Sequence, residues 1–191
     1  MNELKGTVVV IGASGFVGTA LIPVLADSVH SMRCVSRDPD RIGRVLPGNA
    51  LAVRADLLDP GSLDRALQGA ETVFYLAHSL GEKDGFAALE EQAAQNFAFA
   101  AARSRIRRII YLGALAQLSG EVSSDHIASR HRVGEVLRSS GVPVTEFRAS
   151  VVIGAGSMAY EVVRALVERL PIMVTPRWVR MPIQPIAESD L

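Results

Sequence analysis

Short apolar runs alternate along this chain with longer segments in which apolar residues recur every three or four positions. The short runs are rich in valine and isoleucine and predict buried β-strands, whereas the longer periodicity predicts amphipathic helices. The expected strands are residues 7–11, 31–35, 50–53, 72–76, 108–112, 144–148 and 172–175. The expected helices are residues 16–26, 61–68, 85–104, 124–140 and 157–169.

This alternation of strands and helices predicts an α/β fold, in which helices cover both faces of a doubly wound parallel sheet. Right-handed crossovers then give the three α/β/α layers of a Rossmann fold. In the longest helix, one apolar stripe is expected to pack on the sheet: Phe86, Leu89, Ala93, Phe97 and Ala100. Because ligands of such sheets bind at the carboxyl ends of the strands, we expect function in the loops that follow them.

The periodic pattern fades near residue 170. Residues 1–170 are expected to form one Rossmann domain, whereas the stretch 171–191 contains four prolines and Trp178 and has little helical periodicity. We interpret residues 171–191 as the start of a C-terminal substrate-binding lobe. The abrupt ending at Leu191 is typical of a longer protein that has been cut, and we expect such a truncation here.

The chain has 191 residues, 49% of them hydrophobic and 21% charged, as in ordinary globular domains. Its 20 basic and 20 acidic side chains cancel, so neither nucleic acid nor an anionic membrane is an expected partner. No apolar run is long enough to span a membrane and the N-terminus lacks a signal-peptide pattern, which predicts a cytoplasmic protein. Cys34 is the only cysteine and the histidines are scattered, so no disulfide or metal site is expected.

A glycine-rich turn directly follows the first expected strand and opens the first expected helix. A helix N-terminus offers unpaired N–H groups and the positive end of its dipole to a phosphate. Glycine lets the backbone approach the ligand, because a Cβ atom would stand in the way. The order strand, glycine turn, helix therefore predicts a site for a dinucleotide pyrophosphate. The expected contacts are Gly12, Ser14, Gly15, Phe16, Val17 and Gly18.

The end of the second expected strand indicates which dinucleotide binds. Ser36 and Arg37 follow this strand, at the position beside the adenosine ribose in a Rossmann fold. An arginine there favours a 2′-phosphate and a serine adds a hydroxyl, so NADP(H) is the expected cofactor. Asp38 comes next, and an acidic residue favours the free 2′-hydroxyl of NAD, which keeps NAD as the alternative. In a purely structural interpretation, Arg37 is a surface residue paired with Asp38 or Asp40.

Further cofactor contacts are expected after the next three strands. Asp56 and Leu57 follow the third strand, where the Asp56 carboxylate can accept a hydrogen bond from the adenine amino group. Ala77 and His78 follow the fourth strand, where small and polar residues let the cofactor cross the sheet edge. His78 is either a cofactor or substrate contact or a plain loop residue. Gly113, after the fifth strand, is expected to line the nicotinamide side of the cleft.

Taken together, these elements resemble the extended or atypical short-chain dehydrogenase/reductase superfamily, and within it the NmrA-like and epimerase-like members. The resemblance spans residues 7 to about 157 and implies a Rossmann fold with an NAD(P) cofactor. It is carried by the spacing Gly12-x-x-Gly15-x-x-Gly18, by Arg37, by the step Ala55-Asp56-Leu57 and by the segments 72–77 and 139–148.

The resemblance also implies a catalytic serine after the fifth strand and a Tyr-x-x-x-Lys helix, in which the tyrosine exchanges a proton with the substrate. This chain departs from that pattern. Gly113-Ala114 stand where the serine is expected, Ile127 stands at the tyrosine position and His131 at the lysine position. His126 or His131 is the candidate replacement proton donor, because imidazole titrates near neutral pH. The alternative is that both are surface residues of the helix.

The resulting expectation is an NADP-dependent oxidoreductase of the atypical short-chain class, which reduces a small carbonyl or enone. A non-catalytic NADP(H) redox sensor that acts through a protein partner is the main alternative, since the standard catalytic residues are missing. A nucleotide-sugar epimerase-like enzyme is a further alternative. The resemblance also makes the helices at 85–104 and 124–140 candidate faces of a homodimer. The sequence does not indicate the substrate.

Overall fold

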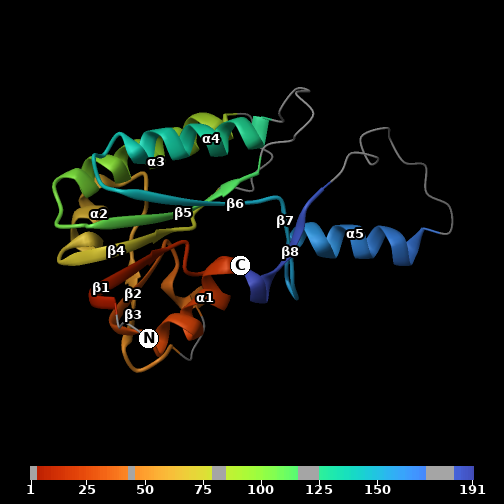
Figure 1. Ribbon diagram of the computed structural model, residues 1–191, viewed down its shortest axis with the longest axis horizontal. Coiled ribbons are helices and arrows are strands. Elements are labelled where there is room, and N and C mark those ends of the chain that lie inside the picture. Colours follow the sequence, from red (N-terminus) through yellow and green to blue (C-terminus); the bar gives the residue numbers. More distant parts are fainter. Residues whose placement is uncertain (1–3, 43–45, 79–84, 116–124, 171–182) are drawn as a thin grey trace.

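Figure 1 shows the computed structural model of the chain, in which residues 4–42, 46–78, 85–115, 125–170 and 183–191 are described. Six parallel strands form one sheet in the order β3-β2-β1-β4-β5-β6, so the strand order reverses between β1 and β4. The strands are β1 (Leu4–Ile11), β2 (Val29–Ser36), β3 (Ala50–Arg54), β4 (Ala70–Tyr75), β5 (Arg108–Ala114) and β6 (Val144–Ala149).

Helices cover both faces of this sheet, which confirms the predicted three-layer Rossmann arrangement. One face carries α2 (Pro60–Leu67), α3 (Phe86–Ala102) and α4 (Asp125–Arg138), and the other carries α1 (Phe16–Ala26) (Figure 1). A short 3₁₀ helix, η1 (Pro39–Ile42), follows β2. The helix α5 (Met158–Arg169) extends away from the sheet, and none of its side chains is buried.

The central strand β1 shows why this sequence forms a sheet that is covered on both faces. Val8 and Val10 are buried on the side of α1, together with Ile22 and Leu25. Val9 and Ile11 are buried on the opposite side, against a larger core that includes Phe97 of α3. A continuous run of β-branched residues is stable in this position because each of its faces finds an apolar partner.

Cys34 of β2 lies fully within the α1-side core. Burial raises the pKa of its thiol to about 11, since the charged thiolate is disfavoured away from water. The thiol is therefore an inert, small apolar group of the folded chain.

The six sheet strands and five helices lie close to the ranges predicted from the sequence, whereas the expected strand 172–175 lies outside the described residues. The predicted apolar stripe of α3 was right in part: Phe97 and Ala100 are buried as expected, and Phe86 and Ala93 are half-buried. Leu89 is exposed, while Glu90 is buried beside Ala94, Phe97 and Ala98. Eight of the 17 residues of α3 are alanine, which is compatible with either a buried or an exposed position. The apolar pattern therefore did not define precisely which side of the helix packs on the sheet.

A second, two-stranded parallel sheet follows the main one. It pairs β7 (Val151–Ile153) with β8 (Pro185–Ala187), so that residues near the end of the chain lie beside residues that precede α5. A 3₁₀ turn, η3 (Glu188–Asp190), follows β8. This small sheet was not predicted, because its strands have only three residues each and one of them begins with proline.

Candidate cofactor-binding site

The glycine turn between β1 and α1 is tight enough to require glycine at two positions. Gly12 has φ of 83°, and a Cβ atom there would lie 2.8 Å from the backbone N of Ala77. A Cβ atom on Gly18 would lie 2.9 Å from Cα of Ala13 and would press against the carbonyl oxygen of Gly12. The Gly15 N–H donates to that same carbonyl oxygen over 2.9 Å, which closes the turn.

Hydrogen bonds join this turn to the strands on both sides of β1. The Ala13 N–H donates to Val35 O of β2 over 3.2 Å, and the hydroxyls of Ser14 and Ser36 lie 3.0 Å apart in a hydrogen bond. On the other side, the Leu76 N–H donates to Ile11 O over 3.0 Å. The turn thus lies at the reversal of strand order, where doubly wound sheets bind their ligands.

The N-terminus of α1 fits a pyrophosphate. Gly15 is its N-cap residue and makes no side-chain cap bond, and the first turn of α1 contains no acidic residue. The N–H groups of this first turn and the positive end of the helix dipole are therefore available to an anion. The side chains of Phe16 and Val17 point elsewhere: the Phe16 ring packs near Gly154, and Val17 lines an apolar cavity.

On the β2 side of the turn, Ser36 is buried and Arg37 is exposed. The Ser36 hydroxyl accepts a hydrogen bond from the backbone N–H of Asp38 over 3.1 Å, which shapes the loop after β2. Within the described ranges, no ion pair joins Arg37 to Asp38 or Asp40, so its guanidinium remains available for an anion.

The segment after β3 forms a compact turn beside that loop. The Ala55 N–H donates to Ser36 O over 3.1 Å, which brings the carboxyl ends of β2 and β3 together. One carboxylate oxygen of Asp56 accepts from the Leu58 N–H over 3.0 Å, and the carbonyl of Leu57 accepts from the Asn96 side chain over 2.9 Å. The N-cap bond of α2 comes instead from Asp59, which accepts from Gly61 N–H.

On the β4 side of the turn, Ala77 lies against Gly12, and His78 follows it. The Nδ1 atom of His78 lies 3.2 Å from Leu76 O. Desolvation of its ring, and next the charge of Arg130, lower the pKa of His78, although the residue is exposed. Gly113 has a packing role of its own, because a Cβ atom there would collide with the carboxylate of Glu146.

The two candidate proton donors of α4 differ in their surroundings. His126 is exposed at the start of the helix and stacks on Phe86 of α3, with ring centroids 4.3 Å apart. His131 is half-buried, and its Nε2 atom is buried without a hydrogen-bond partner among the described residues. A buried polar atom without a partner is costly, and a bound molecule can supply the missing bond.

Arg130 was not among the residues predicted from the sequence. In the structure, its side chain reaches the carboxyl end of β5. Its Nη2 donates to Leu112 O over 2.7 Å, and its guanidinium carbon lies 5.7 Å from the centre of the Tyr111 ring. Deeper between α3 and α4, the Ser129 hydroxyl donates to the buried carboxylate of Glu90 over 2.5 Å. The one indication in the sequence was that the first half of α4 follows a strand end and so lies near the site.

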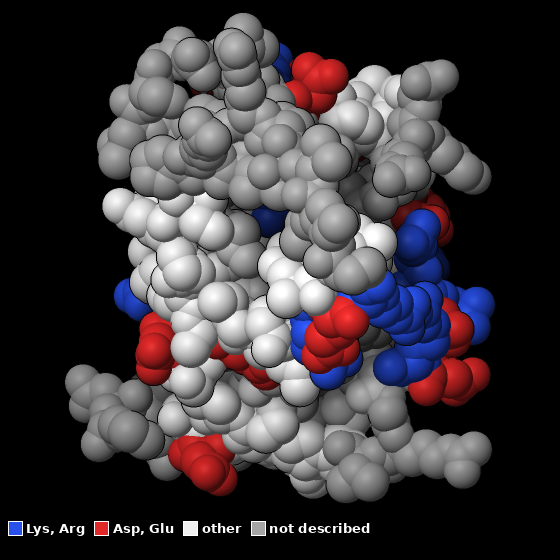
Figure 2. Space-filling model, turned by 90° about the vertical axis from the view of Figure 1, so that its right-hand side faces the viewer, with Lys and Arg blue, Asp and Glu red and all other residues white. Residues whose placement is uncertain are grey.

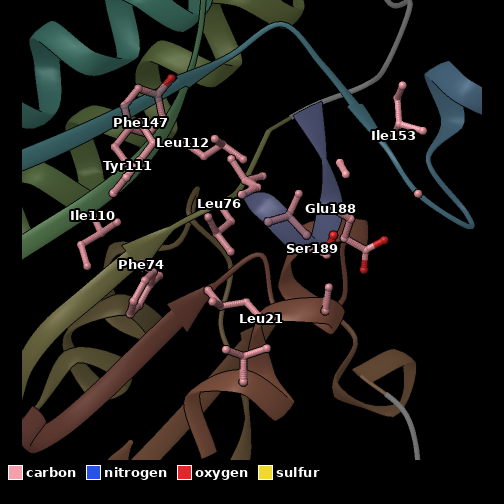
Figure 3. Close-up of a pocket in the computed structure, with 16 residues that line it drawn as sticks. Leu21, Phe74, Leu76, Ile110, Tyr111, Leu112, Phe147, Ile153, Glu188 and Ser189 are labelled. Carbon is pink, nitrogen blue, oxygen red and sulfur yellow. The ribbon is translucent and has the colours of Figure 1, made fainter. Parts of the chain in front are cut away.

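An apolar cavity of about 640 Å³ lies on the other side of the sheet, between α1 and the surfaces of β4 and β5 (Figure 3). Figure 3 shows Leu21 of α1 below Phe74 and Leu76, with Glu188 and Ser189 near the end of the chain on the far side. Its lining is predominantly apolar, and of the predicted cofactor contacts only Val17 is among the lining residues.

The described surface shows neither a metal site nor a membrane-spanning helix. Blue and red side chains are intermixed on the face in Figure 2, beside a broad uncharged area, so the described part of this face has no surface of one sign. In the described ranges no three His, Cys, Asp or Glu residues lie together as metal ligands would. None of the helices described combines the length and apolar character needed to cross a membrane.

Comparisons with known proteins agree with this geometry. Residues 12–170 match the family model for NAD(P)H-binding domains. The chain is 31% identical over 178 residues to (4-alkanoyl-5-oxo-2,5-dihydrofuran-3-yl)methyl phosphate reductase of Streptomyces griseus, which covers 89% of this chain and 59% of that enzyme. It is 41% identical over 81 residues to dihydroflavonol 4-reductase of Zea mays, which covers 38% of this chain and 23% of that enzyme. The chain thus spans only part of each relative.

Solved structures with low sequence identity share the fold. Pen from Bacillus thuringiensis superposes with a TM-score of 0.79 at 17% identity, over 99% of this chain and 63% of that one. The Bordetella bronchiseptica enzyme WbmG, solved in complex with NAD, superposes with a TM-score of 0.69 at 18% identity, over 85% of this chain and 60% of that one. From its glycine turn, its strand order and these matches, the chain belongs to the NAD(P)H-binding family of the extended short-chain dehydrogenase/reductase superfamily.

Proposed function

We propose that this chain binds NADP(H) and forms the cofactor-binding part of a reductase that transfers hydride to a small carbonyl or enone. Membership of an NAD(P)H-binding family supports the cofactor class, and two relatives are named as reductases. The preference for NADP(H), the hydride acceptor and the roles of single residues are our proposal.

The observation that carries the preference for NADP(H) is the environment of Arg37. Its side chain is exposed directly after β2, beside Ser36, whose hydroxyl is hydrogen-bonded to Ser14 of the glycine turn. A guanidinium matches the geometry of a phosphate and stays charged at all physiological pH values. A 2′-phosphate on the adenosine ribose would therefore meet an available cation at this edge of the sheet.

The remaining residues have roles that follow the path of a bound dinucleotide. NADPH would supply the hydride. The N–H groups of the glycine turn would hold the pyrophosphate, and Asp56 and Leu57 would contact the adenine. Ala77, His78 and Gly113 would line the nicotinamide side. His126 or His131 would provide the proton, and the unpartnered Nε2 of His131 favours His131.

The first experiment compares NADPH and NADH by calorimetric titration of the chain and of Arg37→Ala. We expect the substitution to weaken NADPH binding about ten- to hundredfold, as expected for loss of a charge-assisted phosphate contact, and to leave NADH binding unchanged. Arg65→Ala is the matched control, since Arg65 is exposed in the last turn of α2, away from the carboxyl edge. Equal loss for both nucleotides, or none, would contradict the proposed 2′-phosphate contact.

A redox sensor is the second candidate, favoured by Gly113-Ala114 and Ile127 at the positions of the expected catalytic serine and tyrosine. The two functions separate in a single assay of NADPH oxidation with a panel of carbonyl and enone compounds. A reductase loses turnover in His131→Ala or His126→Ala while NADPH binding is kept. A sensor binds NADPH tightly and oxidises it with no compound of the panel. Tightly bound NAD that co-purifies with the chain would instead favour the epimerase-like alternative.

A further inference from the structure

The carboxyl ends of β4 and β5 separate from each other, and this leaves a notch at the sheet edge. The pairing of β4 with β5 ends at Tyr75 and Tyr111, whereas β5 stays paired with β6 up to Ala114. The Ile109 N–H of β5 donates to the carbonyl of Pro143, directly before β6. The N–H of Leu115, directly after β5, donates to the carbonyl of Ala149 at the end of β6. The backbone of Leu112 therefore faces the opposite side, toward a β4 that has already ended.

Arg130 fills this notch from α4. Its Nη2 donates to the Leu112 carbonyl over 2.7 Å, in the place of a missing β4 donor. The Tyr111 hydroxyl donates to the backbone carbonyl of Arg130 over 2.8 Å, and the Tyr111 ring lies under the guanidinium. These contacts hold the side chain at the strand ends. A guanidinium has five N–H donors, so it can donate to a further ligand while it holds Leu112.

The cofactor path leads to the same notch. The glycine turn lies where the strand order reverses, and Arg37 marks the adenosine side, over β2 and β3. The other half of a dinucleotide must then extend across β4 and β5. The charge of Arg130 also acts on His78, which follows β4. After desolvation, Arg130 is the largest cause of the lowered pKa of His78, and its effect is larger than the opposing effect of Glu90.

We propose that Arg130 binds the nicotinamide half of the cofactor and, through its permanent charge, favours the reduced over the oxidised form. The nicotinamide ring is positively charged in NADP⁺ and neutral in NADPH, so a nearby guanidinium repels only the oxidised ring. Its N–H groups donate equally well to ribose hydroxyls in both forms. This inference rests on the proposed binding of NADP(H). Under it, the site retains NADPH, the hydride donor, more tightly than NADP⁺, the oxidised cofactor that must be released.

The test measures the dissociation constants of NADPH, NADP⁺ and adenosine 2′,5′-bisphosphate, which represents the adenosine half alone. For the unmodified chain we expect NADPH to bind about threefold to tenfold more tightly than NADP⁺. Arg130→Gln keeps a donor for Leu112 but removes the charge. It should weaken NADPH binding, bring the ratio of the two constants close to one and leave the bisphosphate unaffected.

Two further variants separate charge from packing. Arg130→Lys keeps the charge and should keep the preference for NADPH. Arg132→Gln, on the exposed side of α4 where Arg132 pairs with Glu91 and Glu135, should change none of the three constants. Unchanged bisphosphate binding shows that a variant is folded, so a loss limited to NADPH cannot come from unfolding.

The outcomes distinguish this inference from the function on which it rests. If Arg130→Gln binds the bisphosphate normally and keeps the same ratio of NADPH to NADP⁺ affinity, Arg130 is only a structural residue and the inference is wrong. The inference is also overturned if the unmodified chain shows no preference between the two forms. If the unmodified chain binds neither the bisphosphate nor NADPH, the proposed function itself fails.

Discussion

At Gly18, a single missing Cβ atom lets α1 begin close to the end of β1. An added methyl group would press on the Gly12 carbonyl and lie 2.9 Å from Cα of Ala13, and all of these are backbone atoms that cannot rotate away. We expect Gly18→Ala to lower the free energy of unfolding by about 1–3 kcal/mol, as overpacked sites do, and to abolish measurable NADPH binding. Urea unfolding and calorimetric titration measure the two effects.

Gly48→Ala is the control for this substitution. A Cβ atom on Gly48 would meet no atom within 4 Å, so the stability and the nucleotide affinity should stay unchanged or rise slightly through the less flexible unfolded chain. If both variants behave alike, the close approach at Gly18 does not limit the turn.

Single residues of the site were predictable to very different degrees. The glycine turn could be predicted because the spacing of its glycines after a β-branched run is typical of a strand–turn–helix unit, and the structure leaves no room for a Cβ atom at Gly12 or Gly18. Arg130 could not, since its position depends on β4 ending before β5, and no local pattern encodes where two distant strands separate. The role of Gly113 was also hidden, because the carboxylate that fills its missing side chain comes from Glu146 of another strand.

At the scale of elements, Glu146 connects the edge strand β6 to α4. Its side chain is only 5% exposed and forms ion pairs with Arg138 of α4 and Arg148 of β6. Gly113 and Gly134 leave the space that this carboxylate occupies. We expect Glu146→Gln to lower the free energy of unfolding by about 1–2 kcal/mol, because two charged hydrogen bonds are lost. Glu135→Gln, in an exposed pair with Arg132, should cost less than about 1 kcal/mol.

The same carboxylate makes stability depend on pH. Burial alone would raise the pKa of Glu146, but the hydrogen bonds and charges of Arg148 and Arg138 outweigh it and hold the pKa below its ordinary value. A lowered pKa in the folded state stabilises the fold above the ordinary pKa of a glutamate, and this contribution is lost as the pH falls through the lowered value. The stability difference between the chain and Glu146→Gln should therefore be largest near pH 7 and shrink below about pH 4. A difference independent of pH would contradict this account.

The strands and helices themselves could largely be predicted, because β-branched runs and capping residues act locally. Asp59 is one example: it precedes Pro60 and caps α2, as such a pair does at many helix starts. The alanine-rich α3 is the opposite case. Its buried face includes Glu90, whose carboxylate is bonded to Ser129 of α4, and only the assembled pair of helices makes that burial favourable.

For the molecule as a whole, the two faces of the sheet are covered unequally. Among the described elements, α2, α3 and α4 pack on one face, whereas on the other α1 covers β1 and β2 and a cavity remains beside β4 and β5. Phe147 of β6 is 51% exposed on the rim of this cavity. The alternating pattern of the sequence predicted that helices would lie on both faces, but it contains no information on how far each face is covered.

Cys34 gives the whole molecule an internal reporter of binding. A thiol reagent can reach this buried residue only when the sheet opens, so the labelling rate measures the population of opened molecules. A cofactor that binds only the closed form lowers this population by the factor 1 + [L]/Kd, which predicts about 100-fold slower labelling with NADPH at 100 times its Kd. Labelling at the same rate with and without NADPH would show that the nucleotide does not stabilise the fold around β2. The labelling rate of the one cysteine of the chain thus reports how often the fold opens, and any ligand that binds the folded glycine turn lowers this rate.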